Sequence, residues 1–482
     1  MHDLGLIPVE IRPKIGVRRI GKKLCLSSLK RGESWMCSGS SPMIWQKLQE
    51  GKTPSQIAGE ISQKYNVPRE KVLTDVLQFA EHLWERQILD LPERQDVSDE
   101  QRAQLVKEQP HNVSQRVAAA AVEAERLCTC VFDLLVPCNL RCRHCYLDFS
   151  HTDVMPLADV CDYLDQLADH GCPEVTFTGG EIFLRRDFIE IVAHAEQRGF
   201  LINMITNGTF ITQQKADELA KYALQTVKMS IYGSTAPLHE AVTKKAGTFE
   251  KTVNAARLLI ERGITVDFAY FVQNHNFKDA FEFPKFARKM GAKHSFDTKL
   301  VPNRNGSKDP LQYGVTVQQQ AELFRSNVIH REVEFVCTAA ASKARITASA
   351  DVYPCELINT ASLGNLKQQT LEEIWASAYR AEMRAAILGY KPKRCGGCNH
   401  TSDCEPCAAM RGFNQEGHME APVSEACLLT TASLLAQGKV MEPSSPFQKF
   451  AESCVDQVLA AEQNSGPHHN LVQIMTARIE GT

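Results

Sequence analysis

Short apolar runs of strand length recur from about residue 128 onward, and stretches with helical spacing separate them. The apolar runs are LCTCVFDLLVP, EVTFT, LINMIT, TVKMSIY, TVDFAYFV and HSFDTKLV. The helical stretches cover about residues 156–170, 186–198, 212–222, 248–262 and 278–290. Strands that alternate with helices predict an α/β fold with a parallel sheet and right-handed crossovers.

The N-terminal part of the chain follows a different pattern. Residues 14–31 and 34–38 are rich in β-forming residues and predict short strands. Three amphipathic helices are then expected, starting near residues 41, 53 and 68. Short strands followed by three helices predict a small winged-helix-like domain. Between this domain and the sheet, residues 92–127 are polar and then alanine-rich, which predicts a linker that contains a helix.

Length and charge restrict the possible functions. At 482 residues the chain is long enough for roughly two to four domains. The net charge of -3 argues against a nucleic-acid binder that neutralises phosphates. No apolar stretch approaches the length of a membrane span, and the N-terminus lacks the apolar core of a signal peptide. We therefore expect a cytoplasmic protein that binds neither nucleic acid nor membrane.

The chain contains seventeen cysteines, and ten of them fall within residues 138–145 and 337–427. Disulfides are not expected in a reducing compartment, so clustered thiols indicate metal or cluster ligands. The first group, Cys138, Cys142 and Cys145, has the spacing C-x3-C-x2-C. An iron–sulfur cluster held by three cysteines keeps one iron open to a small molecule. The alternative is three unlinked thiols in a turn.

With the aromatic Tyr146 directly after the last cysteine, this motif resembles the radical S-adenosylmethionine (radical SAM) superfamily. The resemblance implies a 4Fe–4S cluster on the three cysteines whose open iron chelates S-adenosyl-L-methionine. Cleavage of that cofactor gives a 5′-deoxyadenosyl radical. It also implies a partial (β/α)6 barrel, in which the chemistry lies at the C-terminal ends of the strands.

The next expected strand ends in Gly179, Gly180 and Glu181. Two glycines allow a close backbone approach to a ligand, and a carboxylate accepts hydrogen bonds from a charged amine. In the family this GGE motif holds the amino group of the cofactor's methionine, so the resemblance assigns that role here. Ile182 replaces the proline that is usual in the family.

Two later strands end in Asn207 and Ser230, which by the same resemblance lie near the ribose or the methionine carboxylate. Ordinary turn chemistry is the alternative for both positions. Thr243 stands where many relatives have an arginine that pairs with the cofactor's carboxylate. That contact must then come from Lys244, Lys245 or elsewhere.

The second cysteine group consists of Cys337, Cys355, Cys395, Cys398, Cys404, Cys407 and Cys427. The first two bracket a hairpin-like segment, and two C-x-x-C pairs follow with five residues between them. Zinc ribbons separate such pairs by ~15–20 residues. Seven cysteines also exceed the four ligands of one zinc ion, although zinc at one site stays an alternative.

This arrangement resembles the SPASM domain of peptide-modifying radical enzymes, with two auxiliary 4Fe–4S clusters. The resemblance assigns the outer cluster to Cys395, Cys398, Cys404 and Cys427, and the inner cluster to Cys337, Cys355 and Cys407. Ala350 replaces the motif glycine before Cys355, and the last spacing is two residues instead of three. With three cysteines, the inner cluster is expected to have an open iron that binds a substrate thiolate.

Residues 14–91 resemble the peptide-chaperone domain of pyrroloquinoline quinone biosynthesis, also called the RiPP recognition element (RiPPs are ribosomally synthesised, modified peptides). Members of that family bind the leader of a precursor peptide as an added strand at a sheet edge. The alternative is a winged helix that only packs against the next domain.

The resulting domain prediction comprises a recognition domain (1–91), a linker (92–127), a radical SAM partial barrel (128–330), a SPASM domain (331–430) and a C-terminal helical tail (431–482). The combination is similar to a maturase that modifies a ribosomal precursor peptide, with a flavodoxin or ferredoxin as reductant. A thioether from a cysteine sulfur to a carbon is the expected product. Carbon–carbon crosslinking, epimerisation, sulfatase-type oxidation and a protein that only relays electrons are the alternatives.

Overall fold

The computed structural model describes residues 10–11, 15–20, 23–28, 33–37, 40–86, 88–90, 122, 125–307, 309–329, 336–390, 403–404, 407–410 and 425–437. Most of the helical tail predicted for residues 431–482 lies outside these residues, as does most of the linker.

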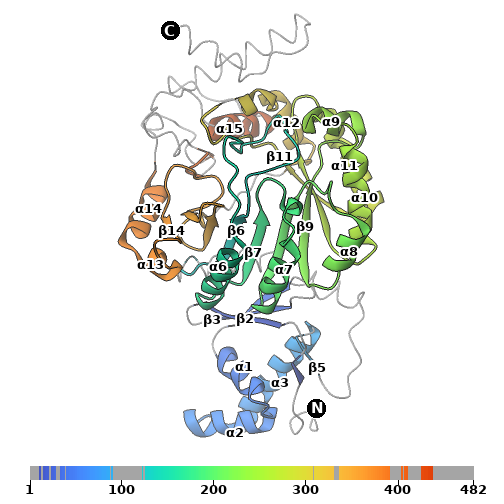
Figure 1. Cartoon of the computed structure of the whole chain (residues 1–482). Coiled ribbons are helices and arrows are strands. Elements are labelled where there is room, and N and C mark those ends of the chain that lie inside the picture. Colours follow the sequence, from blue (N-terminus) through green and yellow to red (C-terminus); the bar gives the residue numbers. More distant parts are fainter. Residues whose placement is uncertain are drawn as a thin grey trace, which may run out of the picture.

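Six parallel strands form the centre of the molecule, in the order of the sequence (Figure 1). They are β6 (Thr129–Asp133), β7 (Glu174–Thr178), β8 (Leu201–Thr206), β9 (Leu224–Ser230), β10 (Val266–Phe271) and β11 (Lys293–Asp297). Within the described residues β11 pairs only with β10, so the sheet does not close on itself. The predicted α/β fold with a partial barrel is confirmed.

Helices cover one face of this sheet, as the spacing of apolar residues predicts. The connecting helices are α6 (Leu157–Asp169), α7 (Phe188–Gln197), α8 (Gln213–Leu219), α9 (Ala236–Thr243), α10 (Thr248–Ile260) and α11 (Phe283–Met290). On β7, Val175 and Phe177 are fully buried in the core under these helices, and Phe177 meets Phe188 of α7 with ring centroids 6.0 Å apart. The alternate positions of the strands therefore face the interior of the open barrel.

Three further strands extend the sheet beyond β6. Strand β12 (Lys343–Ile346) pairs in parallel with β6, and β13 (Asp351–Tyr353) and β14 (Gly364–Asn365) continue antiparallel. Ala350, in the turn between β12 and β13, has φ +73° and is fully buried. The motif glycine that it replaces therefore sits at a position with a left-handed backbone. Helices α12 (Val317–Arg325), α13 (Leu371–Ala376), α14 (Ala378–Gly389) and α15 (Glu425–Ala436) complete this region.

The N-terminal part has a hydrophobic core of its own. Strands β2 (Ile15–Ile20), β3 (Lys23–Ser28) and β4 (Glu33–Cys37) form an antiparallel sheet. Helices α1 (Ser41–Gln49), α2 (Pro54–Tyr65) and α3 (Arg69–Glu85) pack with it around Leu26, Trp45, Ile57 and Val76. A short pair, β1 (Glu10–Ile11) and β5 (Leu89–Asp90), joins its two ends. None of the helices in the described part of the chain is both long and apolar enough to span a bilayer.

Candidate functional site: the cysteine loop at the barrel mouth

Cys138, Cys142 and Cys145 lie on the loop that follows β6, at the C-terminal end of the parallel sheet. The N–H of Cys145 donates to the carbonyl of Cys142 at 3.0 Å, and the N–H of Arg143 donates to the carbonyl of Val242 at 3.1 Å. The loop is thus folded on itself and tied to the end of α9.

The three thiols are near enough to affect one another electrostatically. Burial raises the pKa of Cys142, and the charges of Cys145 and Cys138 raise it further. Burial also raises the pKa of Cys138 to about 11 and that of Cys145 above its usual value. Without a metal these groups are neutral thiols, whereas a coordinating metal deprotonates a thiol outright.

Within the described residues, no three His, Cys, Asp or Glu side chains are close enough to hold a single metal ion. In an iron–sulfur cluster each iron takes its own thiolate, so the ligands surround a body larger than one ion. Three partly buried thiols on one loop, close enough to interact electrostatically, therefore fit the chemistry of a 4Fe–4S cluster. Their assignment as cluster ligands stays a prediction.

Gly179 and Gly180 press the end of β7 against the segment that leads into the cysteine loop. Gly180 donates its N–H to Leu135 O at 2.7 Å, and Glu181 donates its N–H to Pro137 O at 3.0 Å. A Cβ on Gly180 would stand 2.1 Å from Pro137 O, and one on Gly179, whose φ is +143°, would stand 2.4 Å from Leu135 O. Both positions exclude a side chain, because backbone from two strands meets there.

The Glu181 carboxylate is fully buried and joins the ends of β7 and β8. It accepts hydrogen bonds from the Thr206 hydroxyl at 2.6 Å and from the Asn207 N–H at 2.8 Å. Phe183 N–H is a third donor, at 3.1 Å. Burial raises the pKa of Glu181, and these three donors act in the opposite direction. The predicted contact of Glu181 with an amino group is therefore a role added to an existing structural one.

Asn207 connects the end of β8 to the cysteine loop. Its Nδ2 donates to Asn139 Oδ1 at 2.9 Å, and Asn139 Nδ2 donates to the Thr209 hydroxyl at 2.9 Å. Asn207 Oδ1 in turn accepts from the Thr209 N–H and hydroxyl. Asn139 lies between two of the triad cysteines, so this network fixes the backbone of the loop. No role for Asn139 was predicted from the sequence.

Aromatic side chains from two elements border the thiols. Ser230 ends β9, and its side chain bonds the hydroxyl of the buried Tyr232. The charges of Cys142, Cys145 and Cys138 all raise the pKa of Tyr232, after the larger effect of burial. The His144 ring meets the Tyr232 ring edge-on, with centroids 4.9 Å apart. Burial lowers the pKa of His144 to about 3, so this imidazole is neutral.

Tyr146 points away from this group of aromatic residues. Its ring lies under the guanidinium of Arg304, with 5.0 Å from the guanidinium carbon to the ring centroid. Burial, followed by the charge of Asp133, raises its pKa to about 12. Of the two aromatic residues beside Cys145, His144 rather than Tyr146 packs against the barrel residues named above. The position of His144 between two cysteines was the signal that could have identified it.

The structure distinguishes among the candidate carboxylate-binding residues at the end of α9. The Thr243 side chain is buried and bonds Thr248. Lys245 extends to the cysteine loop, with Nζ 3.3 Å from Asn139 O. Lys244 is the left-handed C-cap of α9, with φ 55°.

The described SPASM cysteines form a second group beside β13. Cys337 and Cys355 pack against the same apolar cluster of Ala339, Ile358, Ile387 and Ala408. Burial raises the pKa of Cys355 to about 12, and the charge of Cys407 contributes to that shift. The three thiols predicted for the inner cluster are therefore near one another.

The outer set is only partly described. Cys404 and Cys407 both pack against Met410 and Leu429, and Cys427 lies on α15 two residues before Leu429. Cys395 and Cys398 lie outside the described residues.

Comparison with known families accounts for this arrangement. A model of the radical SAM superfamily matches residues 136–287, one of coenzyme PQQ synthesis protein D (PqqD) matches 24–89, and one of the iron-sulfur cluster-binding SPASM domain matches 337–405. The chain thus carries a radical SAM domain, a PqqD domain and a SPASM domain. These domains imply 4Fe–4S clusters and S-adenosylmethionine as cofactors. The exact domain boundaries and the ligand assignments stay predictions.

Three relatives illustrate the range of this group. An AdoMet-dependent heme synthase of Oleidesulfovibrio alaskensis is 25% identical over 328 residues, covering 58% of this chain and 82% of that protein. The subtilosin biosynthesis protein AlbA of Bacillus subtilis is 25% identical over 265 residues, covering 51% and 59%. The crystal structure of Streptococcus suis SuiB bound to precursor peptide SuiA matches with a TM-score of 0.57 at 14% identity, covering 91% and 99%. That last likeness concerns the fold.

Proposed function

We propose that this chain modifies a ribosomally made precursor peptide by radical chemistry at the barrel mouth. The observation that carries this proposal is the N-terminal PqqD domain, which has its own core and precedes the radical SAM barrel in one chain. Its sheet has the order β2-β3-β4, so in the described part β2 and β4 each have one neighbour. An extended leader peptide adds as a strand at such an edge and raises the effective concentration of the core peptide at the barrel.

In this proposal the barrel residues hold and orient the cofactor. Cys138, Cys142 and Cys145 would hold a 4Fe–4S cluster, which together with S-adenosylmethionine would supply the radical chemistry that removes a hydrogen atom from the peptide. Asn207 and Asn139 fix the loop, while Glu181 and the glycine turn position the methionine end. Tyr232 and His144 exclude water from one side of the thiols.

The proposed product is a thioether. Removal of a hydrogen atom leaves a carbon radical, and a substrate thiolate then forms the S–C bond with release of one electron. Cys337, Cys355 and Cys407 would hold the inner auxiliary cluster, which in its oxidised state would supply the acceptor for that electron, while the thiol proton passes to solvent. With three cysteine ligands in place of four, such a cluster would have one iron available to bind the substrate sulfur.

A second candidate is modification of a tetrapyrrole, which the similarity to the AdoMet-dependent heme synthase favours. Tetrapyrrole modification does not account for the presence of the PqqD domain. Carbon–carbon crosslinking and epimerisation are the alternatives within peptide chemistry.

The test is anaerobic co-expression of the chain with candidate precursor peptides, followed by mass spectrometry and alkylation of free thiols. Loss of hydrogen pairs together with loss of alkylatable cysteines supports a thioether. Loss of hydrogen with free thiols indicates carbon–carbon crosslinking, and an unchanged mass with inverted stereocentres indicates epimerisation. Cys142→Ala must abolish both 5′-deoxyadenosine and peptide modification. A wild-type chain that alters a tetrapyrrole and no peptide would refute the proposal.

A further inference from the structure

Three charged side chains meet where β6 ends, at the barrel mouth. Asp133 is the last residue of β6 and is 4% exposed. Arg304 donates from Nη2 to Asp133 Oδ2 at 2.7 Å. Arg345 is 2% exposed, and its Nε lies 3.8 Å from the same oxygen, which is beyond hydrogen-bonding distance. One carboxylate thus faces two guanidinium groups and is bonded to one of them.

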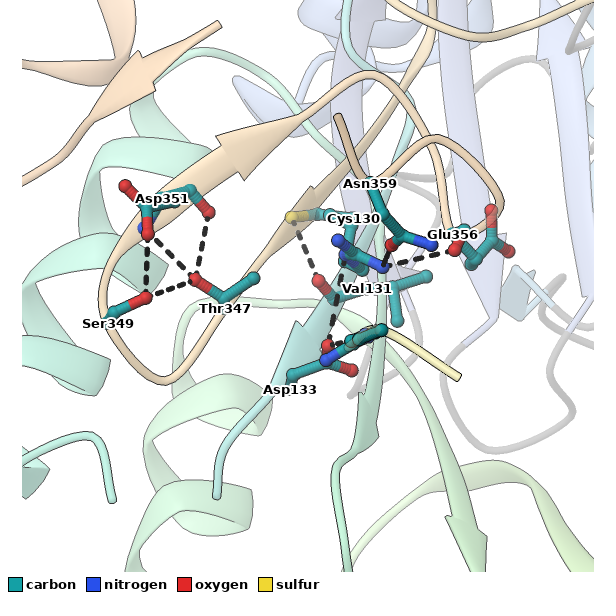
Figure 2. Close-up of polar contacts among 10 residues, drawn as sticks. Cys130, Val131, Asp133, Thr347, Ser349, Asp351, Glu356 and Asn359 are labelled. Atoms are coloured by element: carbon teal, nitrogen blue, oxygen red, sulfur yellow. Dashed lines mark hydrogen bonds and ion pairs between the residues drawn. The ribbon is translucent and has the colours of Figure 1, made fainter. Parts of the chain in front are cut away.

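These residues come from three elements that border the two cysteine groups. Arg304 follows β11, donates its N–H to Tyr146 O at 2.8 Å and so contacts the cysteine loop. Arg345 belongs to β12, and its Nη1 donates to Glu356 O at 3.0 Å and to Asn359 Oδ1 at 2.7 Å. In Figure 2, Asp133 lies on one side of these contacts, and Glu356 and Asn359 lie on the other. The cluster therefore lies between the loop of Cys145 and the loop of Cys355.

The charges in this cluster are not balanced. Burial acts to lower the pKa of Arg304, but Asp133, Tyr146 and Tyr353 together outweigh burial, so the pKa of Arg304 is raised. Burial lowers the pKa of Arg345, Asp133 opposes that shift only in part, and the charge of Arg304 adds to the lowering. Nearby Glu356 forms its ion pair with Lys343, at 2.5 Å. Arg345 is thus a buried cation without a carboxylate of its own in the described part of the chain.

Donors also remain unused. Among the described residues, the buried Nε atoms of Arg304 and Arg345 have no hydrogen-bond partner. A buried N–H of a charged group without a partner is costly, and a surplus buried charge costs more. The guanidinium of Arg345 is held in place over the Tyr353 ring, 4.6 Å from its centroid. The Arg304 side chain is 19% exposed, whereas those of Arg345 and Asp133 are almost fully buried, so solvent reaches the cluster at Arg304.

We propose that Arg304 and Arg345 form a binding site for a carboxylate of the substrate, either an acidic side chain or the C-terminal carboxylate of a peptide. This rests on the proposed function, because it places a peptide between the two cysteine groups. Two guanidinium groups from different elements match the two oxygens of a carboxylate. Asp133 keeps the guanidinium group of Arg304 in position. No covalent step is involved.

The test uses the full chain with reconstituted clusters and small probes in place of the unidentified peptide. The probes are N-acetylglutamate methylamide against N-acetylglutamine methylamide, and N-acetylglycine against N-acetylglycinamide. Saturation-transfer NMR measures binding to the wild type, Arg304→Gln and Arg345→Lys. The matched control is Arg198→Gln, which removes an arginine paired with Asp165 and Asp169 on the outer surface. S-adenosylmethionine affinity is measured in parallel.

We expect one or both acids to bind about tenfold more tightly than their amides, because charge-assisted hydrogen bonds are lost with the amide. This preference disappears in Arg304→Gln, falls in Arg345→Lys and persists in Arg198→Gln. Preference for the glutamate probe identifies a side chain, and preference for acetylglycine identifies a C-terminus. Equal binding of acid and amide to the wild type overturns the proposal. An unaltered preference for the acid in Arg304→Gln overturns it too. So does the result that the arginine variants lose affinity for S-adenosylmethionine and keep their preference for the acid. Probe binding needs no turnover, so these results are independent of whether a peptide is modified.

Discussion

Asn207 Nδ2 donates to Asn139 Oδ1 at 2.9 Å, which joins the end of β8 directly to the loop between Cys138 and Cys142. The same asparagine gives its N–H to Glu181 at 2.8 Å. Three motifs that are far apart in the sequence are thus held by one side chain and its own backbone. The geometry of the cysteine loop thus depends on the ends of β7 and β8.

We expect Asn207→Ala to loosen the cysteine loop. Removing the amide takes away the donor to Asn139 Oδ1 and the acceptor for the Thr209 N–H and hydroxyl, so loop opening should become roughly tenfold more frequent. The measurement is the rate of iron release to a chelator under anaerobic conditions. Asn203→Ala is the control, since Asn203 lies on the same strand but bonds Glu174 and Gln225. Equal release rates for the two variants would contradict a positioning role for Asn207.

Gly180→Ala should prevent normal assembly of the site. The new Cβ would lie 2.1 Å from Pro137 O and 2.3 Å from Val136 O, so the segment that leads to Cys138 must move. The barrel is expected to lose about 2–4 kcal/mol of stability, as for other overpacked sites. Thermal unfolding and iron content after reconstitution measure the two effects. At Gly389 an added Cβ meets nothing within 4 Å, so Gly389→Ala should leave both values unchanged.

Lys245→Met should weaken binding of S-adenosylmethionine by roughly five- to tenfold. The loss of a single hydrogen bond to a charged group typically lowers affinity by about that much. Lys245 Nζ lies 3.3 Å from Asn139 O, within the cysteine loop. Lys244→Met is the matched control, one residue earlier at the end of α9. Equilibrium dialysis with labelled cofactor gives both affinities. If Lys244→Met has the larger effect, the assignment of Lys245 is wrong.

Arg384→Met should remove iron from the inner auxiliary cluster and keep the radical SAM cluster. Arg384 is buried on α14 and donates to Cys337 O at 2.6 Å and to Ala339 O at 2.9 Å. Without it the backbone that carries Cys337 loses its support. Iron content should fall while reductive cleavage of S-adenosylmethionine continues. The exposed Arg325 provides the control Arg325→Met, and a similar iron loss there would indicate a nonspecific effect.

His239 should make stability depend on pH. Burial lowers its pKa from 6.5 to about 4, so the unfolded chain takes up a proton that the folded chain refuses. Stability is therefore lost as pH falls below 6.5, by about 2 kcal/mol at pH 5. Urea unfolding monitored by proteolysis should show a smaller loss for His239→Gln than for the wild type. His151→Gln, at an exposed histidine, should behave as the wild type does.

The barrel was predictable from the sequence because each of its strands and helices is a distinct, continuous segment of the chain with its own apolar pattern. Each apolar run predicted one of the strands β6 to β11, and each stretch with helical spacing in that region contains a helix. Local residue patterns suffice for this because neighbouring strands are consecutive in the sequence. The three-helix arrangement after β4 was predicted for the same reason, and the helix expected near residue 53 is α2, which Thr53 caps through a capping box.

Contacts between distant segments could not be predicted in this way. The pairing of β12 with β6 joins residues more than 200 positions apart, and the sequence indicated only a hairpin. The glycines at 179 and 180 were interpreted as making room for a ligand, whereas the structure shows backbone already at that position. The contacts of Tyr146 with Arg304 and of Tyr232 with His144 depend on the direction in which each side chain points. The spacing of residues along the chain does not determine these directions.

The pairing of β12 with β6 also limits which peptides can react. One strand leads into the cysteine loop, and the other leads through β13 to Cys355, so backbone hydrogen bonds set the separation between the two thiol groups. A peptide that reaches both must match this constant separation. In the proposed crosslinking, the sheet would set the number of residues between the two atoms that become joined, and precursors with another spacing would remain linear.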